Sequence, residues 1–498
     1  MIDPPGEIND PTVIASVPGG DPLEALAAIA AAPTACALVE LRADTMRAEA
    51  IERVVAGAGR RLIVTVRHRG HGGAFDGAED ERVEILRRAL AAGARFVDVE
   101  YGTAAAALTA GEPGRTILSD HAAACEAGIL VERWRAMAAG PATRIKLCPA
   151  APTASSAAAV RAALDDAGAS RRLAAFATGS AGSWTRVLAC AWGSWAVYGA
   201  ATAGAETAAG QLTAVDLLDV YRATSIGEAT RRFALIGGDL SRSPSPAMHG
   251  AAYRAAGVDA VYVPLVGDDL DDLLSVLDDP RRLGASGFGV TMPFKTALAA
   301  RCRPGDAIGA TAGAVNTIVG PSSDRIGFNT DGPAALGLLQ RAVELEGRPV
   351  AIAGAGGTAR AVGSALRGAG AEVTLYGRDP EAAAEAAGRI GVAWGRFDEL
   401  PAASWTALVN ATPLGGAGER WWTAGGLGGR VVLDAVYRPG GTRLIDDARR
   451  RGLVAIDGLD LLAAQAAAQY ERLIGQAPPA GAASFRAAAM QWISSRTS

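Results

Sequence analysis

Eight short apolar runs, each followed by an alanine-rich stretch that favours helix, occupy the first 220 residues of the chain. The runs begin near Thr12, Ala37, Arg61, Arg95, Arg115, Thr143, Arg172 and Trp195. Their spacing fits one strand plus one helix, and eight such units in succession predict a (β/α)8 barrel. Charged residues and histidines follow several of the runs, and a barrel of this kind builds its active site at the carboxyl ends of its strands.

A polar stretch at 224–232 ends this pattern, and a new apolar run at 233–236 begins a second region. Runs at 260–266 and 287–290 alternate there with helical patterns and predict a small α/β unit. The run 350–353 then leads directly into a glycine-rich turn and a helical pattern, which is typical of a Rossmann-type nucleotide-binding domain.

The last 40 residues are alanine-rich and are expected to form helices that pack back onto the middle region. The expected fold class is therefore α/β, with an N-terminal barrel followed by a two-domain α/β half. The expected domain boundaries are 1–225 for the barrel, 232–333 with 460–498 for the middle domain, and 334–459 for the nucleotide-binding domain.

Composition excludes several classes of protein. The formal net charge of -4 argues against electrostatic binding of nucleic acid. The five cysteines are widely spaced and lack any CxxC, so neither a disulfide framework nor a zinc site is expected, and no metal is needed. The chain shows no secretion signal, and its uncharged segment 187–205 is too poor in Leu, Ile and Phe for a membrane span. We therefore expect a cytoplasmic protein without membrane or nucleic-acid partners.

Only two lysines occur, Lys146 and Lys295, among 48 basic residues. An amine can lose its proton, form an imine with a carbonyl or pass a proton to a substrate, whereas a guanidinium stays charged. Two solvated surface lysines would be the ordinary interpretation, but the surroundings of each favour chemistry. Apolar neighbours flank Lys146 at the end of its predicted strand, and His121 closes the preceding strand, so a nucleophilic amine and a general acid/base should converge at the barrel mouth.

Residues 10–222 resemble type I 3-dehydroquinate dehydratase. The motifs that carry the resemblance are Glu40-Leu-Arg42, Thr65-Val-Arg67, Ser119-Asp-His121, the strand of Lys146, the segment Gly179 to Arg186, and Gly210-Gln211. The resemblance implies that Lys146 forms a Schiff base with 3-dehydroquinate while His121 transfers protons. It further implies that the substrate is held by Arg186 and Gln211 at its carboxylate, with Thr207 nearby, and by Glu40, Arg42 and Arg67 at its ring hydroxyls.

Two positions depart from this family. His71 stands where the family usually has a glutamate, so a carboxylate beside the catalytic histidine is lost, which should lower the pKa of that base or loosen its orientation. Ala122 follows the histidine where Asp or Asn is usual. An alternative interpretation is thus a catalytically weak barrel that binds ligands or acts as a scaffold.

The second half resembles shikimate dehydrogenase. The motifs are Ser243-Pro-Ser245-Pro, Gly287 to Lys295, Ala314-Val-Asn316-Thr, Asn329-Thr-Asp331-Gly, Asn410-Ala-Thr412-Pro, Ala435-Val-Tyr437 and Gly458 to Gln465, with Gly289 where Asn or Ser is commoner. The resemblance implies that Lys295 and Asp331 relay a proton while hydride moves between a nicotinamide and the substrate. Substrate-binding residues implied are Ser243, Ser245, Thr291, Asn316, Tyr437 and Gln465.

The glycine-rich turn fits the dinucleotide fingerprint because a strand precedes it, a helix follows it and alanine fills the third position. Cofactor-binding residues implied are Gly354, Ala355, Gly356, Gly357, Thr358, Ala359, Arg378, Thr412, Ala435 and Gly458. Arg378, after the next strand, favours NADP (NADPH) over NAD. Asp379 leaves open the alternative that an acid at this position binds the free ribose of NAD, although Asp379-Pro380 also fits a helix N-cap.

The sequence therefore predicts a bifunctional enzyme that makes 3-dehydroshikimate in the barrel and reduces it to shikimate with NADPH. A quinate/shikimate dehydrogenase that uses NAD remains the alternative for the second half. The expected partners are these small-molecule substrates.

Overall fold

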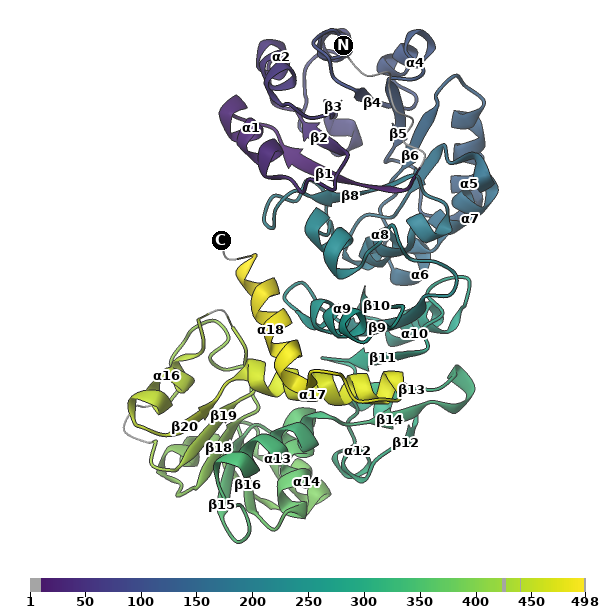
Figure 1. The fold of residues 1–498 in the computed structure, drawn as a ribbon. Coiled ribbons are helices and arrows are strands. Elements are labelled where there is room, and N and C mark those ends of the chain that lie inside the picture. Colours follow the sequence, from purple (N-terminus) through teal and green to yellow (C-terminus); the bar gives the residue numbers. More distant parts are fainter. Residues whose placement is uncertain (1–9, 423–426, 439, 497–498) are drawn as a thin grey trace. The chain divides into compact units, whose positions relative to one another are not determined.

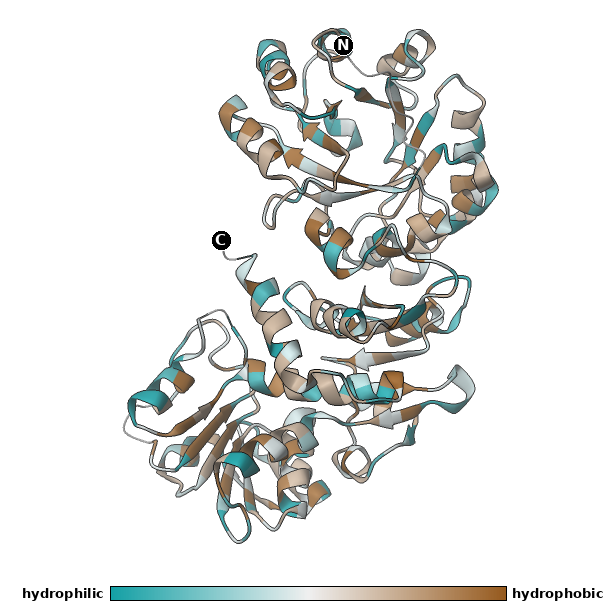
Figure 2. Ribbon diagram, viewed as in Figure 1, coloured by the Kyte–Doolittle hydropathy of each residue, from teal (hydrophilic) through white to brown (hydrophobic). Residues whose placement is uncertain are grey.

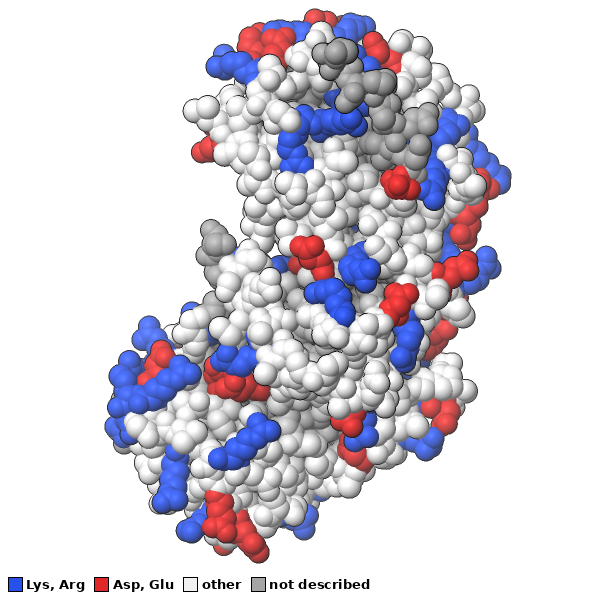
Figure 3. Space-filling model, viewed as in Figure 1, with Lys and Arg blue, Asp and Glu red and all other residues white. Residues whose placement is uncertain are grey.

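The computed structural model describes residues 10–422, 427–438 and 440–496 (Figure 1). The chain divides into two compact units, one of residues 1–230 and 263–284 and one of residues 231–262 and 285–498. Brown apolar residues concentrate on the strands in Figure 2, whereas teal polar residues lie mainly on helices and loops. On the face drawn in Figure 3, basic and acidic side chains are interspersed.

The N-terminal region forms the predicted barrel. Its strands are β1 (Thr12–Pro18), β2 (Leu38–Arg42), β3 (Leu62–Thr65), β4 (Phe96–Glu100), β5 (Thr116–Asp120), β6 (Arg144–Leu147), β7 (Leu173–Ala175) and β8 (Ala196–Ala200). They form a parallel sheet in the order β7-β6-β5-β4-β3-β2-β1-β8, and the backbone N–H of Trp195 donates to the carbonyl of Leu173 (3.1 Å) where β8 meets β7. Each strand begins within one residue of its predicted start, so the barrel prediction is confirmed.

Helices alternate with these strands. They are α1 (Pro22–Ala31), α2 (Ala48–Gly57), α3 (Glu79–Ala91), α4 (Leu108–Gly111), α5 (Ala127–Ala138), α6 (Ala154–Ala157), α7 (Ala159–Ala167) and α8 (Ser183–Leu188). The uncharged segment 187–205 contains β8, whose residues are all buried, as predicted. Within the described part of the chain, no helix is both long and apolar enough to span a bilayer.

A mixed six-stranded sheet follows, in the order β10-β9-β11-β13-β14-β12. Its strands are β9 (Arg231–Gly237), β10 (Ala260–Val266), β11 (Gly287–Val290), β12 (Arg303–Pro304), β13 (Thr317–Val319) and β14 (Ile326–Phe328). The accompanying helices are α9 (Ser245–Ala255), α10 (Leu270–Asp278), α11 (Lys295–Ala299) and α12 (Ala307–Ala312). The C-terminal helices α17 (Gly458–Ile474) and α18 (Gly481–Ser494) pack on α9, which confirms the expected return of the chain end.

The third sheet is entirely parallel. Its strands are β15 (Pro349–Ala353), β16 (Glu372–Gly377), β17 (Ala393–Arg396), β18 (Ala407–Asn410), β19 (Val431–Asp434) and β20 (Val454–Ile456), and its helices are α13 (Asp331–Ala342), α14 (Gly357–Gly368), α15 (Pro380–Ile390) and α16 (Arg443–Arg450). The strand order is β17-β16-β15-β18-β19-β20. It is the doubly wound order of dinucleotide-binding folds, in which ligands bind at the carboxyl ends of the strands where the order reverses, here between β15 and β18.

Two candidate active sites

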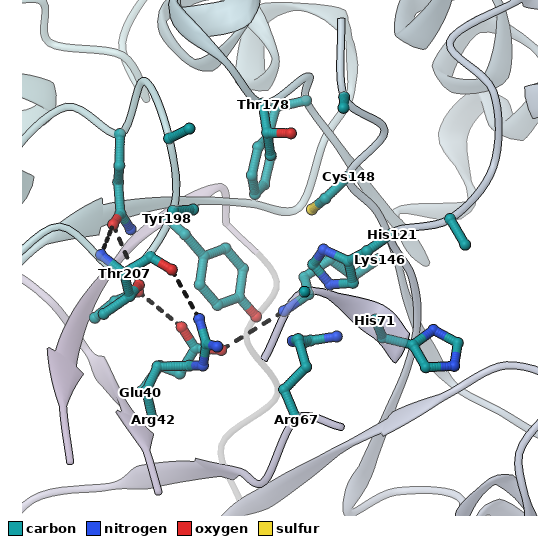
Figure 4. A pocket seen from close by; sticks show the side chains of 18 of the residues that line it. Glu40, Arg42, Arg67, His71, His121, Lys146, Cys148, Thr178, Tyr198 and Thr207 are labelled. Atoms are coloured by element: carbon teal, nitrogen blue, oxygen red, sulfur yellow. Dashed lines mark hydrogen bonds and ion pairs between the residues drawn. The ribbon is translucent and has the colours of Figure 1, made fainter. Parts of the chain in front are cut away.

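The barrel contains a cavity of about 330 Å³ at the carboxyl ends of its strands (Figure 4). All eight barrel residues that the sequence pointed to line this cavity: Glu40, Arg42, Arg67, His121, Lys146, Arg186, Thr207 and Gln211. They come from several different strands or the segments that follow them, and the closed sheet is what brings them together.

Lys146 lies on β6 and is 3% exposed. Its Nζ is 2.5 Å from Asp98 Oδ2 and 3.6 Å from Glu40 Oε1, and it stands 4.5 Å from the ring centroid of Tyr198. Two carboxylates and an aromatic face thus surround one buried amine. A buried ammonium needs such compensation, and the contact with Asp98 supplies most of it.

Arg67 is paired with acidic residues. Its guanidinium donates to Asp98 Oδ1 (3.0 Å) and Glu100 Oε1 (3.5 Å), and only 2% of the residue is exposed. Although burial by itself raises the pKa of Asp98, the charges of Lys146 and Arg67 outweigh it and hold that pKa well below the usual range. The guanidinium of Arg67 is therefore already held by two carboxylates. Its expected contact with a ring hydroxyl of the substrate would be an additional interaction.

His121 projects into the same cavity, and its buried Nε2 has no hydrogen-bond partner among the residues that the structure describes. Burial lowers the pKa of His121 well below its usual value, and the positive charges of Arg67 and Lys146 add to that effect, while Asp98 opposes it. The sequence-based expectation ascribed a lowered pKa to the carboxylate lost at residue 71, whereas the main cause here is burial. Such an imidazole is neutral and free to accept a proton.

His71 ends a short 3₁₀ turn after β3 and also lines the cavity (Figure 4). Its Nδ1 is buried, and no described residue forms a hydrogen bond with it. The glutamate usual in the family is absent at residue 71, but His121 still has an acidic neighbour. Asp98 is close enough to raise the pKa of His121.

Arg186 places a buried cation in the wall of the cavity. The residue is 1% exposed, its Nη1 donates to the carbonyl of Tyr198 (2.9 Å), and its guanidinium carbon lies 4.4 Å from the ring centroid of Phe176. Within the described part of the chain its Nε has no hydrogen-bond partner, and burial lowers the pKa of the guanidinium to about 10. A buried guanidinium with an unused N–H favours an incoming anion such as a carboxylate.

The loop after β8 carries Thr207 and Gln211 to the cavity. Gln211 Oε1 accepts hydrogen bonds from the backbone N–H (2.7 Å) and the hydroxyl (3.2 Å) of Thr207. The carbonyl of Thr207 in turn accepts from Arg42 Nη1 (2.9 Å), while Asp44 accepts from Arg42 Nη2 (2.8 Å). These bonds fix the loop against β2.

A second pocket, of about 430 Å³, lies where the second and third sheets meet. Twelve of the residues that the sequence pointed to line it: Ser243, Ser245, Thr291, Lys295, Asn316, Asp331, Thr358, Thr412, Ala435, Tyr437, Gly458 and Gln465. Of the remaining predicted cofactor residues, Gly354 to Gly356 form the turn between β15 and α14, Gly357 and Ala359 lie in the first turn of α14, and Arg378 follows β16.

Lys295 and Asp331 form an ion pair at 2.6 Å between Nζ and Oδ2. The amide of Asn316 donates to Asp331 Oδ1 (2.8 Å) and to Gln465 Oε1 (3.2 Å). Asn316 is 1% exposed, so its amide orients the carboxylate of the pair. Its predicted contact with a substrate hydroxyl would be an additional interaction and stays a prediction.

The glycine turn has the geometry of a dinucleotide site. Gly354 adopts a φ of +115°, and a Cβ there would lie 3.1 Å from the carbonyl oxygen of Ala411, so only glycine fits. Helix α14 then begins at Gly357 with free backbone N–H groups, which suit a pyrophosphate. Ala359 is fully buried in the core between α14 and the sheet.

Asp379 caps a helix. Its Oδ1 accepts from the backbone N–H groups of Glu381 (3.0 Å) and Ala382 (3.2 Å) at the start of α15. Of the two roles that the sequence left open, the structure therefore shows the N-cap. Arg378 is exposed beside it.

The sequence placed Asp98 and Glu100 among the charged residues at the ends of the barrel strands without a role for either, and their alternation along β4 directs both carboxylates into the barrel. Sequence reasoning missed two other residues that shape these sites. Tyr198 gave no such signal. Asp434, at the end of β19, accepts from Asn410 Nδ2 (2.8 Å) and Thr442 Oγ1 (2.6 Å), and burial raises its pKa to about 6. It connects loops that line the second pocket.

Both halves of the chain are similar to known proteins. Residues 13–228 match the family model of type I 3-dehydroquinase, and residues 235–318 match that of the shikimate dehydrogenase substrate binding domain. Over 484 residues the chain is 28% identical to the chloroplastic bifunctional 3-dehydroquinate dehydratase/shikimate dehydrogenase of Arabidopsis thaliana, covering 89% of this chain and 78% of the relative.

Over 250 residues it is 37% identical to the shikimate dehydrogenase (NADP(+)) of Pyrococcus abyssi, covering 49% of this chain and 93% of the relative. The crystal structure of shikimate 5-dehydrogenase from Thermus thermophilus in complex with NADP(H) and shikimate is 32% identical, with a TM-score of 0.48, and covers 53% of this chain and 99% of that one. With a type I 3-dehydroquinase domain before a shikimate dehydrogenase, the chain belongs to the bifunctional 3-dehydroquinate dehydratase/shikimate dehydrogenase family.

Proposed function

We propose that the barrel dehydrates 3-dehydroquinate through a Schiff base on Lys146 and that the second pocket reduces 3-dehydroshikimate to shikimate with NADPH. The observation that carries the first half is a buried amine between two carboxylates, with an unpartnered neutral His121 in the same cavity. A scaffold or binding module has no need of that combination. We assign these roles to residues 1–225, to 232–333 with 460–498, and to 334–459, and we place the protein in the cytoplasm, since all five cysteines are free thiols.

In the barrel, the Lys146 ammonium passes a proton to the neutral imidazole of His121 and the amine attacks the ketone carbon; the imidazolium returns this proton to the departing oxygen. Water leaves, and a carbon–nitrogen double bond forms. His121 removes the proton from the adjacent carbon, the iminium accepts the electron pair, and the ring hydroxyl then departs as water with a proton returned by the imidazolium. Hydrolysis of the imine frees the lysine. Arg186 holds the substrate carboxylate during these steps.

In the second pocket, NADPH supplies the hydride. Lys295 donates a proton to the carbonyl oxygen of 3-dehydroshikimate as the hydroxyl forms, and Asp331 keeps the lysine ammonium in place. Ser243 and Ser245, whose hydroxyls lie 3.2 Å apart, bind the substrate carboxylate. The site suits a dinucleotide because only glycine fits at Gly354 and the N-terminus of α14 faces the turn.

We propose NADP as the cofactor. Arg378 follows β16, where a 2′-phosphate is recognised in this fold. The alternative hypothesis, a quinate dehydrogenase that uses NAD, rested on an Asp379 carboxylate available to a ribose. That carboxylate accepts two backbone hydrogen bonds as the N-cap of α15. Arg378→Ala should therefore raise KM for NADP+ about 10-fold or more and leave KM for NAD+ nearly unchanged, since a charged hydrogen bond to phosphate is lost.

Borohydride reduction in the presence of 3-dehydroquinate tests the barrel chemistry. We expect a covalent adduct on the peptide that contains Lys146, identified by mass mapping, and no adduct in the Lys146→Arg variant, which keeps the charge but cannot form an imine. Shikimate oxidation by the same preparations is the control for folding. An unmodified Lys146 in a protein that oxidises shikimate with NADP+ would contradict the proposed lyase and leave the dehydrogenase.

A further inference from the structure

Thr358 belongs to the glycine turn by sequence, but its hydroxyl lies at the catalytic pair of the second pocket. Lys295 Nζ donates to Thr358 Oγ1 (3.4 Å), and Thr358 Oγ1 donates to Asp331 Oδ2 (3.2 Å). Because the lysine and the aspartate are themselves 2.6 Å apart, three polar atoms close a triangle. The hydroxyl uses one lone pair and its single proton in this contact.

The same residue faces the dinucleotide site with its backbone. Thr358 is the second residue of α14, so its N–H is among those that the helix leaves without an intrahelical acceptor. A phosphate at this helix N-terminus therefore contacts the main chain of a residue whose side chain contacts Lys295 and Asp331.

The first turn of α14 is also tightly docked around this point. A Cβ at Gly357 would lie 3.0 Å from the Cβ of Ala314, and Arg360 Nε donates to the carbonyl of Ala312 (2.7 Å). These contacts hold the residues on both sides of Thr358, so the first turn of α14 and Thr358 move together. Its hydroxyl therefore responds to whatever shifts the turn.

Resting on the dehydrogenase function proposed above, we propose that Thr358 is a positioning residue that couples occupancy of the dinucleotide turn to the Lys295–Asp331 pair. Its hydroxyl accepts from the ammonium and donates to the carboxylate, so it fixes the position of each group relative to the other. When a pyrophosphate engages the turn, this hydroxyl sets the orientation of the lysine toward the substrate carbonyl. A residue that only contacted the cofactor would have no reason to aim its side chain at the pair.

Thr358→Val tests this coupling because it keeps the shape and removes the hydroxyl, and Thr358→Ser is the matched control that keeps the hydroxyl. We would measure shikimate oxidation with NADP+ from pH 6 to 10, and the proton released when NADP+ binds, by calorimetry in buffers of different ionisation enthalpy. For the valine variant we expect kcat/KM for shikimate to fall about 10-fold, its pH profile to move by about half a pH unit or more, and KM for NADP+ to stay within about 2-fold.

The serine variant should restore the wild-type pH profile and proton release. The coupling is wrong if the valine variant gives the wild-type profile, or if its only defect is a raised KM for NADP+, because either result reduces Thr358 to a backbone or cofactor contact. Thermal unfolding of each variant identifies a misfolded one, and Thr358→Ala then replaces valine. A wild-type protein without NADP+-dependent shikimate oxidation would instead contradict the proposed function itself.

Discussion

The Tyr262 hydroxyl occupies the space that a side chain at Gly289 would need. A Cβ added at Gly289 would collide with the hydroxyl of Tyr262. The Tyr262 ring is fixed by stacking on His249, with 4.1 Å between the ring centroids, and both residues are buried. The glycine is thus the partner of a neighbouring tyrosine, which accounts for the absence here of the Asn or Ser common in the family.

This pairing predicts a double-mutant result. Gly289→Asn alone should lower the free energy of unfolding by about 1–3 kcal/mol through overpacking. Adding Tyr262→Phe removes the colliding oxygen and should recover part of that loss, a coupling that chemical denaturation of the four proteins in the cycle would measure. Strictly additive losses would show that the tyrosine oxygen is not what excludes the larger residue.

The low pKa of His121 predicts how dehydration depends on pH. Its pKa lies well below 6.5 in the folded protein, so the base is neutral and active throughout the neutral range, and activity should fall only on the acid side of pH 6.5. His71→Glu adds a negative charge to the cavity, which favours the imidazolium and should move this acid limb to higher pH. The limb is measured from kcat/KM for 3-dehydroquinate.

His71→Gln is the neutral control and should leave the limb in place. If the glutamate and glutamine variants shift the acid limb equally, the charge at residue 71 does not act on His121.

At the scale of elements, α3 contributes a fully buried arginine to the barrel. Arg82 binds Glu79 in a bidentate pair (2.7 and 2.9 Å), contacts Glu100 on β4, and donates to the carbonyl of Val66 (3.1 Å). Glu100 in turn holds Arg67 at the cavity. The helix is thereby joined to the floor of the active site by alternating charges.

Arg82→Gln should therefore be costly. It leaves Glu100 buried without one of its two cations, and breaking a buried pair costs about 3–5 kcal/mol. Arg87→Gln on the same helix is the matched control, because Arg87 is exposed, its Glu84 partner is 3.8 Å away, and an exposed pair contributes about 0–1 kcal/mol. Equal unfolding midpoints for the two variants would contradict this role of the buried network.

At the scale of the whole molecule, each pocket is lined by residues of one compact unit only. Lys146 lines the first pocket and Lys295 lines the second. The two proposed activities should consequently be separable by single substitutions that leave the other pocket intact.

We expect Lys146→Arg to lose dehydration by at least about 1,000-fold and to keep shikimate oxidation, and Lys295→Ala to show the reverse pattern with a loss of at least about 100-fold. An equimolar mixture of the two variants should convert 3-dehydroquinate and NADPH to shikimate, because the intermediate can diffuse between molecules. NADPH consumption followed by its absorbance measures this. A mixture that stays inactive although each variant keeps its remaining activity would show that the intermediate must pass within one chain.

The sequence by itself determined the alternation of strands and helices, the start of every barrel strand and the glycine turn before α14. These features depend on neighbours along the chain, where apolar periodicity and the conformational freedom of glycine act locally. It also indicated the two lysines, because only their chemistry distinguishes them from 46 arginines.

The tertiary structure alone decided how the polar groups are paired. Arg67 binds Asp98 and Glu100, and the hydroxyl of Thr358 reaches Lys295, 63 residues earlier in the chain. Such partners meet only when the sheets close and the helices pack, because a buried polar group takes whichever partner the fold brings within about 3 Å, however distant in sequence.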